Sequence, residues 1–313
     1  MDTHNTNENA RLILREVSRI LTGKDEVIVK ALLAILAGGH ILMEDIPGVG
    51  KTTLAVALSG ALGLDYNRVQ FTPDVLPSDI TGYSILDHSS NLLIYQKGAV
   101  LCNLFLADEL NRATSRTQSA LLQAMEEGKV TVDNQTYPVP QPFIVIATQN
   151  PVGAKGTQML PDSQLDRFML RLSLGYPSHE DEMEIVRRRQ QGITADTARQ
   201  VVSREDLLAM KKETEQIFVK DIVLDYIVTL CEKTRIHPGI IQGSSPRGSL
   251  ALTALARAVA WLQGRDYVLP RDVRFVYHDC IDHRLIWSQD VAPSGHTEIL
   301  EAIMKAVKAP AIQ

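Results

Sequence analysis

The chain has 313 residues, of which 45% are hydrophobic and 22% charged, and it carries a net charge of −5 at pH 7. These proportions lie close to the average of globular proteins and exclude a disordered tail, a collagen-like fibre and a low-complexity chain. The length corresponds to about two domains, and the absence of a basic excess argues against a dedicated nucleic-acid-binding protein.

Helices alternate with short apolar strands in the first part of the chain. Apolar residues at three- and four-residue spacing predict a helix from about Asn9 to Ala37, which Gly23 interrupts, and a second over Lys51–Leu62. A helix over Gln118–Glu127 and a β-hairpin over 129–139 follow. Apolar runs short enough to be buried strands occupy His40–Met43, Ala99–Ala107, Phe143–Ala147 and Met169–Leu174. This alternation predicts a parallel sheet covered by helices on both faces.

After Tyr176-Pro177 the pattern changes to helices with charged faces and no strands. The expected helices cover Glu180–Arg189, Arg204–Thr214, Asp221–Arg235, Pro246–Gln263, Pro270–Leu285 and Thr297–Val307. We therefore expect two domains, an α/β core over 1–177 and an all-helical domain over 178–313.

The N-terminus and the cysteines indicate a reducing compartment. Residues 1–12 are polar and contain no apolar signal-peptide segment. The longest apolar stretch, Ala31–Met43, is too short to span a bilayer. Cys102, Cys231 and Cys280 form no CxxC pair, so neither a zinc ribbon nor a disulfide framework is indicated. We expect reduced thiols in a cytoplasmic protein without a membrane span.

The segment EDIPGVGKTT (44–53) lies between an apolar strand and a helix, which is the setting of a nucleotide phosphate loop. Gly48 and Gly50 let backbone N–H groups approach phosphate oxygens, and the helix adds its positive N-terminus. Lys51 is expected to bridge the β- and γ-phosphates, and the Thr52 hydroxyl to bind Mg²⁺. The alternative is an ordinary turn before a helix.

Four more residues complete this expected phosphate-binding segment. Pro47 and Val49 belong to the loop itself, whereas Thr53 is counted with it as a residue of the helix. The first position of the G-x-x-x-x-G-K-[ST] pattern holds Asp45 instead of glycine. Aspartate tolerates unusual backbone dihedrals at the start of a turn, so the substitution is compatible with the loop.

Two acidic residues, Asp108 and Glu109, directly follow the apolar run Ala99–Ala107. Asp108 is expected to hold Mg²⁺, and Glu109 to polarise the attacking water. The alternative for this pair is a strand followed by an acidic helix cap. A second run, 143–148, ends in Gln149-Asn150-Pro151, where the Asn150 amide could orient the lytic water. The alternative here is an asparagine that merely starts a loop before proline. The carboxyl ends of parallel strands are where ligands of open α/β sheets bind.

Together these strand ends resemble those of AAA+ ATPases, and most closely those of the MoxR family. The resemblance extends from about Leu21 to about Leu285 and covers nearly the whole chain. It depends on the segments EDIPGVGKT (44–52), FLADELNRAT (105–114), QSALLQAMEEGKVTV (118–132), IATQNP (146–151), LPDSQLDRFMLRL (160–172) and GSSPRGSLAL (243–252).

The resemblance implies a three-layer, parallel-sheet P-loop AAA+ core with a C-terminal helical lid. In that fold Asn150 has the sensor-1 position. Arg167 has the position of an arginine finger that reaches the neighbouring subunit's γ-phosphate, and Arg247 has the sensor-2 position. Ser245 as a cap and Pro246 at the first helical position agree with Arg247 in a first turn.

The resemblance also suggests roles for less specific segments. The segment around Val27 and Ile28 is similar to the stretch that packs on adenine, with an ordinary helix start as the alternative. Residues 78–98 are similar to an insertion in helix 2 that faces the ring axis, and 129–139 to the hairpin before sensor 1. In the insertion, Tyr83 or Tyr95 could contact a client, with plain packing as the alternative. Arg112 and Arg116 are candidates for further intersubunit arginines or for interface salt bridges.

The implied activity is Mg²⁺-dependent ATP hydrolysis at the subunit interfaces of a homo-oligomeric ring, expected to be a hexamer. MoxR-like proteins act as chaperones or in metal insertion, with partners that carry a von Willebrand factor A domain. Two alternatives stay open: a magnesium-chelatase-like motor subunit, and a nucleotide-sensing scaffold that does not hydrolyse ATP. Neither nucleic acid nor a membrane is expected as a partner.

Overall fold

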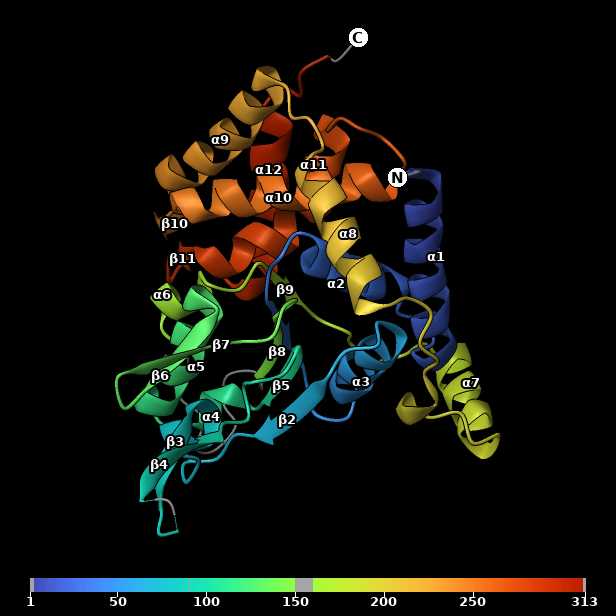
Figure 1. The fold of residues 1–313 in the computed structure, drawn as a ribbon. Helices are drawn as coiled ribbons and strands as arrows, with labels where there is room; N and C mark the ends of the chain where they lie inside the picture. Colours follow the sequence, from blue (N-terminus) through green and yellow to red (C-terminus); the bar gives the residue numbers. More distant parts are fainter. Residues whose placement is uncertain (1–2, 90, 150–159, 312–313) are drawn as a thin grey trace.

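The computed structural model describes residues 3–89, 91–149 and 160–311 of the chain, and the first half of these builds a five-stranded sheet (Figure 1). The strand order is β2-β5-β8-β1-β9, and all neighbouring strands run parallel. Their bounds are β1 Ile41–Glu44, β2 Tyr66–Gln70, β5 Leu104–Asp108, β8 Ile144–Gln149 and β9 Leu170–Leu172. Because the strands are parallel, all their carboxyl ends meet at one edge of the sheet, where the predicted motifs lie.

Both faces of the sheet are buried, as the alternation of side chains along a strand requires. Ile41 and Met43 point to one face, where they pack with α1 (Thr3–Ile20), α2 (Asp25–Leu36) and α3 (Lys51–Ala61). Leu42 and Phe105 point to the other face, which α4 (Pro77–Thr81) and α5 (Ser115–Glu127) cover. These three layers confirm the α/β fold class that the sequence predicts.

Local signals in the sequence end several of these elements. Gly23, with φ 71°, separates α1 from α2. Gly128, with φ 63°, follows α5 directly. The expected hairpin is present as β6 (Lys129–Val132) and β7 (Gln135–Pro138). Its turn residues Asp133 and Asn134 both have positive φ, which is the backbone conformation that a two-residue hairpin loop requires.

The elements of the second half of the chain are α7 His179–Gln190, η2 Ala195–Thr197, α8 Arg204–Glu215, α9 Asp221–Ile236, β10 Ile240–Gln242, α10 Pro246–Leu262, α11 Pro270–Ile281, η3 Asp282–Arg284, β11 Ile286–Trp287 and α12 Pro293–Ala306. In Figure 1, α7 lies at the height of the sheet, whereas the elements from α8 onward form a helical layer above it. One hydrophobic cluster joins this layer to the sheet, since it contains Leu252 and Tyr277 as well as Ile41 and Met43.

The structure corrects three expectations about these elements. The run Ala99–Ala107 is not one strand, because the N–H groups of Ala99 and Val100 bond to carbonyls of α4 and the strand begins only at Leu104. The second half is not all helical, because β10 and β11 pair antiparallel. The edge strand β2 was not expected at all, since its sequence YNRVQ is polar and half exposed.

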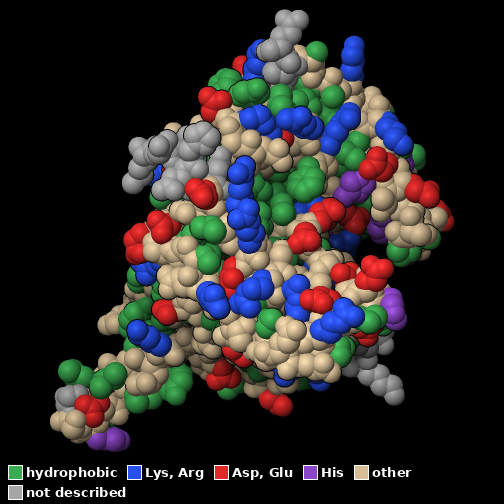
Figure 2. Space-filling model, turned by 90° about the vertical axis from the view of Figure 1, so that its right-hand side faces the viewer, with side chains coloured by type: hydrophobic (Ala, Val, Ile, Leu, Met, Phe, Trp, Pro, Cys, Tyr) green, Lys and Arg blue, Asp and Glu red, His purple; other side chains and the backbone are tan. Residues whose placement is uncertain are grey.

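A second hairpin projects from the sheet layer. It consists of β3 (Gly82–Asp87) and β4 (Leu92–Lys97), joined to the core through α4, and it forms the lowest part of the molecule in Figure 1. Figure 2 shows hydrophobic side chains around its tip. Tyr95 belongs to its base, where its ring stacks on Tyr137 of β7 with centroids 3.8 Å apart. Within the described residues, no helix has both the length and the apolar character needed to cross a bilayer.

Candidate functional site

The phosphate loop has the backbone that its glycines predict. Gly48 has φ 87° and Gly50 has φ 109°, both in the region that favours glycine. A Cβ at Gly50 would also lie 3.0 Å from Leu21 Cδ1, so this position is restricted by packing as well as by its dihedral angles. Gly50 caps α3, and the loop therefore presents its N–H groups at the start of that helix.

Lys51 is the buried cation of this loop. Its Nζ donates to the carbonyl oxygens of Asp45 at 2.5 Å and Ile46 at 3.1 Å. Burial lowers the pKa of Lys51, while the charges of Asp45, Asp108 and Glu109 act in the opposite direction. The ammonium group is thus held inside the loop by neutral carbonyls, which a phosphate oxygen can replace with a charge-assisted bond.

The two acids predicted at the end of β5 are held in different ways. The Thr148 hydroxyl donates to Asp108 Oδ1 at 2.6 Å, and the Arg68 guanidinium lies 2.6 Å from Oδ2. Glu109 follows with φ 56°, and its N–H donates to Thr148 Oγ1 at 2.8 Å. Its carboxylate pairs with Arg112 at 2.7 Å. Thr148 at the end of β8 therefore positions both acids through one hydroxyl group.

A cavity of about 360 Å³ at this site brings the phosphate loop and the two acids together. Its lining residues are Pro47, Gly48, Gly50, Lys51, Thr52, Thr53, Arg68, Gln70, Asp108 and Glu109. Thr52 and Asp108 supply a hydroxyl and a carboxylate, the hard oxygen donors that Mg²⁺ prefers, so these residues fit that ion. Arg68 and Gln70 were missed by sequence reasoning, because they belong to the unpredicted strand β2.

Asp45 has a structural task that the sequence does not reveal. Its buried carboxylate accepts hydrogen bonds from the Leu174 N–H, from the Ser173 hydroxyl at 3.0 Å and from the Gly175 N–H at 3.1 Å. These three residues follow β9 and lead toward α7. The side chain at the first position of the loop therefore ties the loop to the segment that connects the sheet to the helical layer.

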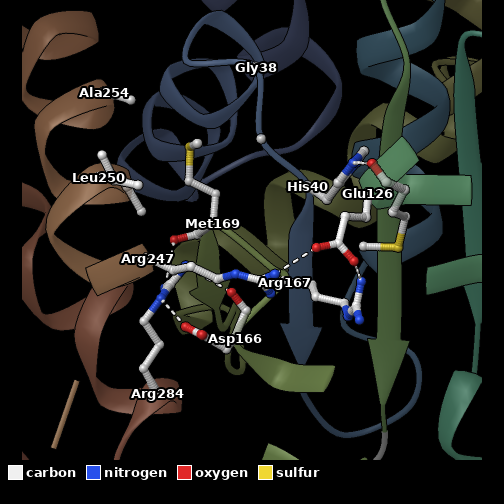
Figure 3. A pocket seen from close by; sticks show the side chains of 13 residues that line it. Gly38, His40, Glu126, Asp166, Arg167, Met169, Arg247, Leu250, Ala254 and Arg284 are labelled. Atoms are coloured by element: carbon white, nitrogen blue, oxygen red, sulfur yellow. Dashed lines mark hydrogen bonds and ion pairs between the residues drawn. The ribbon is translucent and has the colours of Figure 1, made fainter. Parts of the chain in front are cut away.

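Arg167 and Arg247 lie together in a different cavity, of about 380 Å³ (Figure 3). Both guanidinium groups point to one carboxylate, that of Glu126 near the end of α5. Arg247 Nη2 lies 2.6 Å from Glu126 Oε1, and Arg167 pairs with Oε2. Burial and the charge of Arg247 lower the pKa of Arg167. Among the residues that the structure describes, none lines both this cavity and the phosphate-loop cavity.

The turn that carries Arg167 is fixed by the helical layer. Asp166 accepts from Ser245 Oγ at 2.9 Å, and Ser245 in turn caps α10, where it accepts from the Arg247 N–H at 3.2 Å. Arg284 lies 3.0 Å from Asp166 and donates to the Phe168 carbonyl at 2.7 Å. These contacts place Arg167 and Arg247 relative to each other through the backbone of both segments.

The remaining residues have less specific surroundings. Ile28 is fully buried in the hydrophobic core, and Val27 is partly buried against it. Asn150 lies outside the described residues, so its sensor-1 role stays a prediction. His283 is a buried residue of the helical layer, with its Nε2 2.9 Å from the Phe168 carbonyl. The three cysteines are free and buried. Across the described segments, no cluster of three or more His, Cys, Asp or Glu residues could hold a metal.

Comparison with known proteins gives consistent matches over most of the chain. Residues 40–170 match the family model "ATPase family associated with various cellular activities (AAA)", and 232–307 match the "AAA lid domain". The chain is 42% identical to the uncharacterized protein YeaC of Bacillus subtilis, covering 95% of this chain and 93% of that protein. It is 40% identical to Chaperone MoxR1 of Mycobacterium tuberculosis, covering 88% and 75%.

A solved structure shows the same fold. A crystal structure of a protein from Cytophaga hutchinsonii superposes with a TM-score of 0.91 at 35% identity, covering 99% of this chain and 97% of that one.

Proposed function

The chain belongs to the MoxR family of AAA+ ATPases, and from this premise we propose that it hydrolyses ATP with Mg²⁺ at the subunit interfaces of a homo-oligomeric ring. The energy of this cycle serves to remodel or activate partner proteins, in keeping with the relative named Chaperone MoxR1. We further propose a division into a core of residues 1–177 and a lid of residues 178–313.

The phosphate-loop cavity forms one half of the proposed catalytic site. Lys51 binds the terminal phosphates, and the N–H groups behind Gly48 and Gly50 bind the others. Glu109 orients the attacking water and takes its proton, and the bond from its N–H to Thr148 fixes its backbone there. When bound between Thr52 and Asp108, Mg²⁺ would offset the negative charge that the phosphates develop.

The separation of the two cavities is the observation that carries the proposed subunit interface. Arg167 and Arg247 share a cavity with each other and with none of the phosphate-loop residues. A positive group must come within hydrogen-bond distance of the γ-phosphoryl oxygens to stabilise the transition state. Both arginines are therefore proposed to act on nucleotide held by a second copy of the chain, with a hexameric ring as the expected assembly and Asn150 as the sensor-1 residue.

The β3–β4 hairpin is proposed as the contact surface for the partner protein. Its residues Ile85, Leu86, Leu92, Leu93 and Ile94 are all exposed, and an exposed apolar group of this kind is typical of protein–protein contact sites. We propose a protein with a von Willebrand factor A domain as the partner, and cytoplasm as the location.

Glu109→Gln tests the proposed activity. Glutamine keeps the shape of the side chain but does not readily take a proton, so we expect ATP to bind and phosphate release to fall by about 10²-fold or more. Glu205→Gln, the same change at an exposed position of α8, should behave like the wild type. For the wild type, the rate per chain should rise with protein concentration, because the site needs two chains.

A wild-type protein that binds ATP but releases no phosphate at any protein concentration would contradict the proposal. That result would favour the non-hydrolysing scaffold instead. The Glu109→Gln variant is expected to bind ATP without hydrolysing it. Affinity purification with this variant in the presence of ATP is therefore also the way to identify the partner protein.

A further inference from the structure

Neither the helix that carries Glu126 nor its neighbours in the sequence account for a carboxylate at this position. It is the penultimate residue of α5, and a carboxylate near the C-terminus of a helix meets the negative end of the helix dipole, which is unfavourable. Its contacts are instead with two arginines from distant parts of the chain, Arg167 in the turn before β9 and Arg247 in the first turn of α10. Figure 3 shows Glu126 between them.

The charges around the cavity leave an excess of one positive charge. Arg284 and Asp166 pair with each other at 3.0 Å, which leaves two arginines to share the one carboxylate of Glu126. His40 also lines the cavity but is neutral, because burial lowers its pKa to about 4 and its Nδ1 accepts from the Val145 N–H at 3.0 Å. An anion that enters this cavity therefore meets a net positive charge.

The two ion pairs of Glu126 with Arg167 and Arg247 can be broken with little loss of free energy. The side chains of Glu126, Arg167 and Arg247 are 44%, 29% and 49% exposed, and ion pairs that are this open to solvent contribute little to stability. A phosphate offers guanidinium groups more acceptor oxygens and bidentate geometry. The phosphate would also contact the two arginines inside a subunit interface, where less water competes for the guanidinium groups and electrostatic attraction is stronger.

We propose that Glu126 is a displaceable internal anion, which holds Arg167 and Arg247 at one point until the terminal phosphate of a nucleotide on a second copy takes its place. This inference rests on the proposed function of the two arginines. It assigns Glu126 a regulatory role: the carboxylate competes with the incoming phosphate and sets how strongly nucleotide promotes assembly. ADP has no γ-phosphate and displaces Glu126 less readily than ATP.

Glu126→Gln tests the competition, and Glu127→Gln is its matched control. Glu127 is the next residue of α5, is also exposed, and lies 3.8 Å from Lys129 instead of the arginines. The measurement is the protein concentration of half-maximal assembly, by sedimentation velocity with ATPγS and with ADP. We expect Glu126→Gln to lower that concentration by about threefold to tenfold, the scale of two weak ion pairs. Glu127→Gln should leave it unchanged, and the difference between the two nucleotides should become smaller in Glu126→Gln alone.

The direction of the change separates competition from damage, because a variant that only destabilises the fold raises the concentration needed for assembly. An unchanged or raised concentration in Glu126→Gln would overturn the inference. The gain should also disappear when Arg167→Ala and Arg247→Ala are both added, since Glu126 acts through these two side chains; a gain that persists in that background would equally overturn the inference. If the wild type binds ATPγS but does not assemble, the proposed ring fails as well, and this outcome differs from assembly with the wrong response to Glu126→Gln.

Discussion

At the scale of single residues, Lys51 shows how a charge is kept ready for a ligand. Its ammonium group is buried and donates to two backbone carbonyls of its own loop. Lys51→Ala should reduce ATP affinity by about 10²-fold or more, because a methyl group cannot replace charge-assisted bonds to phosphate. Isothermal titration calorimetry measures this, with Lys97→Ala at an exposed position of β4 as the control. If Lys51→Ala and Lys97→Ala bind ATP with equal affinity, Lys51 does not bind the phosphates.

Asp45 is the residue whose role the structure explains and the sequence does not. Its carboxylate satisfies two backbone N–H groups and one hydroxyl after β9. Asp45→Ala leaves the buried Leu174 N–H without its partner, so we expect the free energy of unfolding to fall by about 2–3 kcal/mol. Chemical denaturation measures the loss, and Asp74→Ala, at an exposed loop position, is the control. ATP affinity should fall as well, because the phosphate loop loses its tether. A loss of stability no greater than that of Asp74→Ala would show that the tether has no energetic weight.

At the scale of elements, the proposed contact surface on the β3–β4 hairpin predicts that partner binding can be lost without loss of catalysis. Leu92 and Leu93 are 65% and 66% exposed and belong to neither hydrophobic core of the described residues. Exchange of both for serine should therefore change stability by less than about 0.5 kcal/mol. ATP turnover should stay normal, while the amount of partner protein retained by the Glu109→Gln form should fall.

The control for the hairpin is Ile236→Ser, since Ile236 ends α9 in the lid and is 72% exposed. It removes a comparable exposed apolar side chain at a site remote in the fold. Partner retention that falls equally in both variants would mean that the hairpin is not a specific contact. Turnover that falls in the hairpin variant would mean that the hairpin takes part in assembly or catalysis.

At the scale of the whole molecule, the proposed interface predicts that two chains complete one site. Arg167→Ala should bind ATP normally but hydrolyse it poorly, since an arginine finger contributes about 10³-fold or more. Glu109→Gln should also be inactive, but through a fault on the opposite side of the interface. Mixing the two variants in equal amounts should restore about one quarter of the wild-type rate, the share of complete interfaces in randomly mixed rings.

The control for this mixture is a chain that carries both substitutions, which forms no complete interface with itself. Subunit exchange is checked separately, by labelling the two variants with different fluorophores. If the mixture stays inactive although the subunits exchange, Arg167 acts within its own chain and the proposed interface is wrong.

Much of the site could be predicted from the sequence because it depends on neighbouring residues. The two glycines of the phosphate loop have the positive φ that their position requires, and Ser245 caps α10 as its place before Pro246 indicates. Asp108 and Glu109 follow a buried strand, and parallel strands bring such ends to one edge. In each case the backbone conformation of a few consecutive residues determines where the side chain lies.

Only the tertiary structure decided the remaining contacts, because they join residues that no local pattern connects. Arg68 reaches Asp108 from the edge strand β2, whose polar sequence gives no apolar periodicity to read. Asp45 finds its partners 128 to 130 residues later. Glu126 meets Arg167 41 residues away and Arg247 121 residues away. The sequence shows which residues are charged and which helices and strands carry them. Only the packing of the layers determines which of these charges come into contact.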